Sequence, residues 1–231
     1  IVVVMHLGVT VMRTDRALFT FDSAEYATAG RATARLGHLA TTFVLPHEST
    51  RPSEPPFPLI LGHPLVPLAN ALAFRLGGVH GALTLVFPGI ALMLLAACVT
   101  ILASALGAGP GVAFAAAVAA VMQPALLHYA SEGLTEIPFA LALAAASLAL
   151  ARAPGKGRAL VMGLALGMAH LARPVMMPLM PAWIAGLACV APAGGRMRTV
   201  AWALLAFVPF AVALALYKSM AAGDAFADVA R

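Results

Sequence analysis

Long apolar runs separated by short polar breaks dominate the chain after residue 80. A helix that crosses the hydrocarbon core of a bilayer needs roughly 20 mostly apolar residues, so we expect each run to be a transmembrane helix. The runs are Leu83–Leu106, Val112–Tyr129, Ile137–Ala151, Ala159–Arg173, Pro174–Pro192 and Val200–Tyr217. Ile1–Met12 is too short to cross alone and is interpreted as the end of a truncated first span, which makes seven spans in all.

The stretch from Ala159 to Pro192 is predicted to be two spans rather than one. A single helix of that length would extend about 50 Å at 1.5 Å per residue, whereas the hydrocarbon core is about 30 Å thick. The residue before a proline disfavours helix, so Arg173-Pro174 is the expected break. Two spans also place the basic loops Arg152–Arg158 and Arg196–Arg198 on the same side of the membrane.

A polar, proline-rich stretch from Arg13 to Gly78 separates the first two spans. Two of its segments are predicted to be helical. Ser23–Leu36 has Ser23 as its N-cap and Glu25 in its first turn, and Pro64–Leu76 is apolar on most sides. Both segments suit a position in the membrane interface rather than across it.

The predicted fold class is therefore all-α: a polytopic transmembrane helical bundle whose long outer loop, between spans 1 and 2, bears interfacial helices. The predicted organisation is a truncated first span at 1–12, an outer loop at 13–78, spans 2 to 7 at 79–220, and the start of the next outer loop at 221–231. The chain opens inside an apolar run and stops without a terminator, so we expect it to be a fragment.

Composition and charge support this interpretation and orient the spans. Hydrophobic residues make up 62% of the chain and charged residues 10%, whereas soluble domains are about half apolar and about a quarter charged. Five basic residues without any acid occupy the loops after the predicted spans 4 and 6, which marks that side as cytoplasmic. All nine acids fall on the other side. Chemistry there has no ATP or nucleotide sugar, so a transferase would need a donor delivered in the membrane.

Asp22 is the first candidate for chemistry. A carboxylate close to the membrane surface can accept a proton from an acceptor hydroxyl during sugar transfer. The alternative is that Asp22 and Glu25 only cap and charge the start of a helix. Glu132 and Glu136 are four residues apart and can share one helix face. They are interpreted as ligands for the acceptor or, with Asp22, for a divalent cation, or as parts of a solvated loop and helix start.

Arg173 and two histidines are further candidates. An ionisable residue at a membrane-level helix break is a functional hypothesis by default, and a guanidinium matches phosphate geometry bidentately. The alternative is that Arg173 snorkels from a helix end. His63, beside Pro64, and His170, near Arg173, are candidates for substrate contact or ordinary packing residues. No residue spacing matches a zinc site or a P-loop.

Several of these features occur in an order that resembles a known superfamily. They are the D-x-x-x-Y pattern of Asp22 and Tyr26, the segment Pro55–Pro58 before an apolar helix ending in glycine, the acids after the third span, and the glycine-rich fifth span with Gly163 and Gly167 that ends at Arg173. In this order they resemble the GT-C glycosyltransferases, in particular the group that contains the protein O-mannosyltransferases and the lipid A aminoarabinose transferases.

The resemblance implies a reaction and a site. Asp22 would be the general base in a displacement at an anomeric carbon with inversion, and Arg173 would stabilise the charge on the leaving polyprenyl phosphate. The residues implied in substrate binding are Glu25, Tyr26, His63, Glu132, Glu136, His170 and Arg173. Many members of the group have two adjacent acids where this chain has Asp22-Ser23, so the role of a second acid is lost here or has moved to Glu25.

The resemblance also implies partners and a location. The partners are a polyprenyl-phosphate sugar donor, a lipid, glycan or protein acceptor, and membrane lipid, with no nucleic acid. The resemblance assigns no definite cofactor, and it leaves the use of a divalent cation open. The expected location is the plasma or bacterial inner membrane, with several spans and an extracytoplasmic active site. A secondary transporter and a noncatalytic polytopic protein are the other hypotheses. Transporters usually show internal repeats, and none stands out in this sequence.

Overall fold

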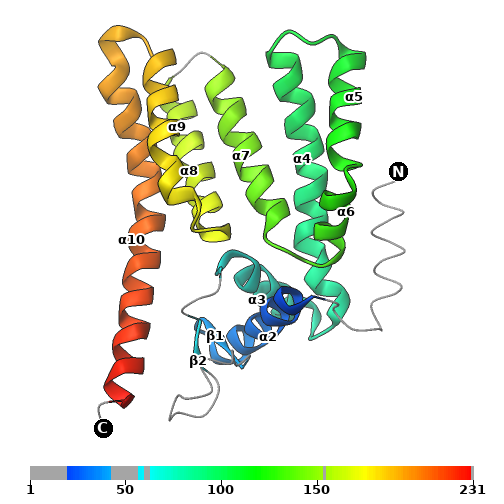
Figure 1. Ribbon diagram of the computed structural model, residues 1–231, viewed down its shortest axis with the longest axis vertical. Coiled ribbons are helices and arrows are strands. Elements are labelled where there is room, and N and C mark those ends of the chain that lie inside the picture. Colours follow the sequence, from blue (N-terminus) through cyan, green and yellow to red (C-terminus); the bar gives the residue numbers. More distant parts are fainter. Residues whose placement is uncertain (1–19, 43–56, 60–62, 153–154, 230–231) are drawn as a thin grey trace. The chain divides into compact units, whose positions relative to one another are not determined.

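The computed structural model describes residues 20–42, 57–59, 63–152 and 155–229, and within these ranges the chain is predominantly helical (Figure 1). It divides into two compact units. The first unit comprises Ile1–Gly89, Tyr129–Thr135 and Ala213–Arg231, and the second comprises Ile90–His128 and Glu136–Val212. The all-α class predicted from the sequence is confirmed for this part of the chain. The predicted first span at 1–12 and the segment Pro55-Pro56 lie outside the described residues.

Two packed helices organise the first unit. Its elements are α2 (Phe21–Leu36), β1 (Ala40–Thr41), β2 (Phe57–Pro58), α3 (Leu65–Gly77) and the 3-10 turn η2 (Gly81–Leu85). Helices α2 and α3 lie side by side (Figure 1). They approach closely at Gly30, because a Cβ there would lie 2.6 Å from Asn70 Cβ. Both helices predicted in the loop are thus confirmed.

The residue that caps α2 differs from the prediction. The helix begins at Phe21, and its N-cap is Thr20, whose hydroxyl oxygen accepts a hydrogen bond from the Ser23 backbone N–H at 3.3 Å. Ser23 therefore lies inside the first turn. The Thr-x-x-Ser spacing offered two possible caps, and the upstream residue holds the extended backbone (φ −103°, ψ 151°) that an N-cap needs.

A tyrosine on the last helix closes the two-stranded part of the first unit. Ala40 pairs with Pro58 in the antiparallel β1–β2 ladder. The Leu59 backbone N–H donates to the Tyr217 hydroxyl oxygen at 3.0 Å, and that hydroxyl donates to the Leu39 carbonyl at 2.8 Å. Both backbone groups beside this short ladder are thereby satisfied by one side chain.

The remaining helices follow the apolar runs of the sequence. They are α4 (Val86–Ala105), α5 (Pro110–Val121), α6 (Pro124–Ser131), α7 (Glu136–Ala151), α8 (Lys156–Ala172), α9 (Met176–Val190) and α10 (Arg196–Val229), with the 3-10 turn η3 (Ala193–Gly195) before α10. In the part of the chain that is described, Gly81–Ala105 and Ala193–Ala221 are long and apolar enough to cross a membrane. The pair α5 and α6 would be a third such segment if it acts as one.

The breaks between helices agree with the sequence at one place and differ at another. The break predicted at Arg173 is confirmed: α8 ends at Ala172, and Arg173 has an extended backbone (φ −150°, ψ 125°) before α9. The run Val112–Tyr129 is not one helix, because α5 and α6 meet at a 55° bend. Pro124 has no backbone N–H to continue α5, and it stands at the first position of α6, where none is needed.

Small residues let α8 pack closely against α10 in the second unit. A Cβ at Gly163 would lie 2.8 Å from Ala206 Cβ and closer still to the Ala203 carbonyl oxygen. One turn along α8, a Cβ at Gly167 would meet the ring of Phe210. Between apolar helices, such small residues allow the backbone contact that stabilises association in lipid. Met162 and Leu166 on α8 are fully buried in the same core.

We expect Gly163→Ala to destabilise the second unit, while Gly157→Ala does not. The added methyl at 163 must displace the α10 backbone, an overpacking that costs roughly 1–3 kcal/mol. At Gly157, also on α8, a Cβ meets nothing within 4 Å. Thermal unfolding of the two variants in the same detergent compares them, and equal melting temperatures would show that the close α8–α10 approach is unimportant.

Candidate functional site

The first turn of α2 carries the predicted base. Asp22 is the second residue of the helix, and its side chain is exposed, whereas the next residue, Ser23, is buried. The positive end of the helix dipole favours a carboxylate at this position. Asp22 is thus accessible from outside the first unit, on a turn that is fixed by its neighbours.

A carboxylate from a distant part of the sequence fixes this turn. Glu132 is buried, and its Oε2 accepts a hydrogen bond from the Thr20 backbone N–H at 3.2 Å. Ser23 Oγ lies 2.6 Å from the Glu132 carbonyl oxygen and 3.0 Å from Oε2, and it donates its single hydrogen there. Since that hydrogen is used, the Thr20 hydroxyl is the donor in its short hydrogen bond with Ser23 Oγ. Glu132 therefore completes the N-terminal cap of α2.

Glu132 and Glu136 do not share a helix face, contrary to the expectation from their spacing. Helix α6 ends at Ser131 and α7 begins at Glu136, so Glu132 lies in the connection. Gly133 turns the chain there with φ +72°, and a Cβ on it would lie 3.3 Å from the Thr84 carbonyl oxygen. This left-handed turn breaks the helical spacing, which leaves Glu132 in the first unit and Glu136 in the second.

Tyr26 lies in the core of the first unit rather than at its surface. Its ring is buried with Val66 and Leu134, and Phe87 and Tyr129 pack against them. Its carbonyl accepts a hydrogen bond from Asn70 Nδ2 at 3.4 Å. The buried tyrosine of the D-x-x-x-Y pattern thus fixes how α2 is turned about its own axis. This in turn fixes the direction of Asp22, one helical turn earlier. Glu25 and His63, both half-buried, are placed in the same unit.

The second unit brings Arg173 and Glu136 together. The Arg173 Nη2 donates to Glu136 Oε1 in an ion pair, and the two side chains are 36% and 22% exposed. Glu136 is the first residue of α7, and Arg173 stands in the extended link after α8. The sequence predicted both residues as substrate-binding but did not predict the pair. A partly exposed ion pair of this kind is worth about 1 kcal/mol or less, so it positions Arg173 without locking it.

His170 belongs to the interior of the second unit. It lies three residues before Arg173 in the last turn of α8, it is 7% exposed, and its ring centroid is 6.0 Å from that of Phe207 on α10. This placement is that of a packed core histidine, and the structure does not bring it to the surface.

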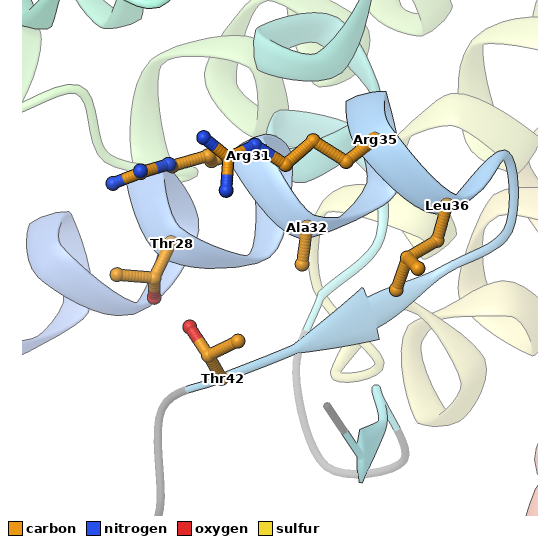
Figure 2. A pocket seen from close by; sticks show the side chains of 6 residues that line it. All are labelled: Thr28, Arg31, Ala32, Arg35, Leu36 and Thr42. Carbon is orange, nitrogen blue, oxygen red and sulfur yellow. The ribbon is translucent and has the colours of Figure 1, made fainter. Parts of the chain in front are cut away.

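Two arginines that were not predicted as site residues line a pocket on α2. Arg31 and Arg35 are four residues apart, so they share one helix face, and with Thr28, Leu36 and Thr42 they line a pocket of about 400 Å³ (Figure 2). Both arginine side chains run along the helix toward its N-terminal end (Figure 2). The i, i+4 spacing of arginines in a predicted helix was the available signal.

Metal ligands do not converge in the described ranges. There, no three His, Cys, Asp or Glu side chains are placed so that they could hold one ion together. Asp22 and Glu132 approach the same turn of α2, but Glu132 already accepts hydrogen bonds from Thr20 and Ser23. The group available for chemistry in this arrangement is the exposed Asp22 carboxylate, on the fixed first turn of α2.

Comparison of the chain with protein-family models, with curated proteins and with solved structures finds no match.

We expect Glu132→Ala to destabilise the first unit far more than Asp22→Asn. Removing the Glu132 carboxylate leaves the partly buried Thr20 N–H without its acceptor, which costs roughly 1–3 kcal/mol. Asp22→Asn removes only an exposed charge near a helix dipole, worth about 0.3–1 kcal/mol. Hydrogen exchange at the amides of α2 measures the difference. Equal protection of α2 in the two variants would contradict a capping role for Glu132.

Proposed function

We propose that the chain is part of a polytopic membrane glycosyltransferase, and that it transfers a sugar from a polyprenyl-phosphate donor to an acceptor hydroxyl on the extracytoplasmic face. The observation that carries the proposal is the exposed Asp22 carboxylate on the first turn of α2. Its position is fixed by the Glu132 cap and by the buried Tyr26 ring. The seven-span bundle, the GT-C likeness and the location in the plasma or inner membrane are parts of the same proposal.

The exposed apolar side of α3 supports the proposal that the first turn of α2, which carries Asp22, lies at a membrane surface. Leu68, Leu72 and Leu76, spaced one helical turn apart, are 42%, 61% and 81% exposed, while the opposite side of α3 packs on α2. Helix α3 ends at Gly77, and the span-length segment begins at Gly81. The intervening three residues reach about 10 Å, so the end of the leucine stripe stays close to the boundary of the bilayer.

The chemistry requires one base and one leaving group. The Asp22 carboxylate accepts the proton of the acceptor hydroxyl while that oxygen bonds to the anomeric carbon. The bond from this carbon to the donor phosphate breaks, and the phosphate leaves with the electron pair. The buried Glu132 carboxylate accepts a hydrogen bond from Ser23, so an acid lies against position 23, where the resemblance expects one. This placement favours Glu132 over Glu25 for the role of second acid.

We also propose, from the sequence, that Arg173 is the cation that stabilises the leaving phosphate. One guanidinium nitrogen donates to Glu136, and the planar, permanently charged guanidinium has the geometry that suits the oxygens of a phosphate. Its test is separate from that of Asp22. Arg173→Lys keeps the charge and loses the bidentate geometry, so we propose that it raises the KM for the donor more than it lowers kcat.

A secondary transporter is the second candidate, because the described helices include two interruptions. One is the 55° bend between α5 and α6, and the other is the extended link at Arg173 beside an ion pair. Broken helices that carry charges line substrate sites in many transporters. Under that hypothesis the exposed Asp22 would have no catalytic part.

We expect Asp22→Asn to lower sugar transfer by about 10²–10⁴-fold, the usual contribution of a positioned general base. The measurement follows release of labelled sugar from polyprenyl-phosphate donors by the membrane-embedded protein with a crude acceptor pool. Glu25→Gln removes a carboxylate one turn away on the same helix, and as a substrate contact rather than the base it should lower transfer far less. If Asp22→Asn retains full transfer, the base is another residue, and if no donor is consumed by the unaltered protein, the transporter hypothesis gains.

We expect a nitroxide label at Leu72→Cys to lie in lipid. Its relaxation should respond more strongly to oxygen, which concentrates in the bilayer, than to a water-soluble nickel complex. A label at Arg35→Cys, an exposed charged position on α2, provides the comparison and should respond more to the nickel complex. A label at Leu72 that behaves like one in bulk water would contradict the interfacial position of α3.

A further inference from the structure

The second unit contains a further pocket, of about 520 Å³, between the starts of α8 and α10. Both helices begin at the same end of that unit (Figure 1). The pocket walls include Gly155 and Lys156 from the start of α8, and Gly195, Arg198, Thr199 and Trp202 from the start of α10. The two loops that the sequence assigns to the cytoplasmic face therefore meet around one cavity.

The pocket is cationic without compensation. The sequence contains no Asp or Glu from residue 137 to residue 223, and the one acid of the second unit, Glu136, pairs with Arg173. Arg198 is exposed and makes no hydrogen bond or ion pair within the described ranges. The Lys156 ammonium lies 4.2 Å from the centroid of the Trp202 ring. This cation–π contact holds the ammonium at the pocket wall.

Polar groups of the backbone and of Thr199 face the same space. The N-cap of α8 is Gly155, which has no side chain to accept from the first N–H groups of this 17-residue helix, so these donors and the positive end of the dipole remain available to an anion. Independently, Thr199 lines the pocket and is 8% exposed, and its hydroxyl makes no hydrogen bond within the described ranges. This hydroxyl can therefore bond to a ligand that enters the pocket.

We propose that this pocket binds a phosphate group. Phosphate supplies the acceptor oxygens that the Arg198 guanidinium, the Lys156 ammonium, the Thr199 hydroxyl and the α8 N–H groups require. The pocket stands at the start of the apolar segment Ala193–Ala221, and basic pockets between helices at a membrane face are suited to the head groups of anionic phospholipids. A soluble phosphate compound offers the same chemistry, and the experiment distinguishes the two sources.

The test is binding to the purified protein in a nonionic detergent. Short-chain phosphatidylglycerol, short-chain phosphatidylcholine and inorganic phosphate are titrated separately, with native mass spectrometry and thermal shift as readouts. The variants are Arg198→Gln, at an exposed position, and Thr199→Val, which keeps the side-chain shape. Arg152→Gln is the matched control, because it removes the same charge from the α7–α8 link and lines a different pocket with α4.

We expect phosphatidylglycerol to bind, and Arg198→Gln to weaken it by at least about 10-fold, as loss of a charged hydrogen bond does. Thr199→Val should weaken it less, and Arg152→Gln should leave it unchanged. Tight binding of inorganic phosphate with the same pattern of losses would support the pocket and assign it to a soluble phosphate. Equal losses in Arg152→Gln and Arg198→Gln, or no binding of either anion by the unaltered protein, would overturn the proposal. All of these outcomes are independent of sugar transfer.

Discussion

The need to satisfy every backbone polar group away from water is the constraint on which the structure of this chain depends. With 62% hydrophobic residues, the chain has few side chains that can hydrogen-bond to the backbone, so helices must satisfy most N–H and C=O groups internally. A helix leaves unsatisfied groups only at its ends. It is therefore at helix ends that the polar residues of this chain gather: Glu132 at the start of α2, Arg173 at the end of α8, and the cationic pocket at the starts of α8 and α10.

The sequence predicted most of the helices because their signals are local. Runs of apolar residues, glycine and proline at the breaks, and the residue before Pro174 each act within a few positions along the chain. The same local signals predict α3 to within one residue at each end. They do not predict the bend within the apolar run Val112–Tyr129. A proline can lie within a bent helix or begin a new one, and the hydrophobicity of the surrounding residues does not distinguish the two. Here Pro124 begins α6, at a 55° bend from α5.

The candidate site was predicted only in part, for a different reason. Asp22 could be selected because its neighbours in sequence define a helix start. The cap from Glu132 spans 112 positions from Thr20, and the ion pair of Arg173 with Glu136 spans 37. No periodicity encodes such pairs, since they arise from packing between elements. The buried position of Tyr26 was also missed, because an i, i+4 pattern states that two residues share a side of a helix but not which of them is covered.

The glycine turn in the short connection after α6 places one acid in each unit. If residues 131–136 were helical, Glu132 and Glu136 would lie on one face and repel each other. The left-handed backbone of Gly133 (φ +72°) separates them, and a larger residue there would be strained and would press on the Thr84 carbonyl. Each acid then compensates a different positive group: Glu132 the dipole end of α2, and Glu136 the guanidinium of Arg173. Asp22 is left as the exposed acid of its turn, because a buried carboxylate already satisfies the backbone beside it.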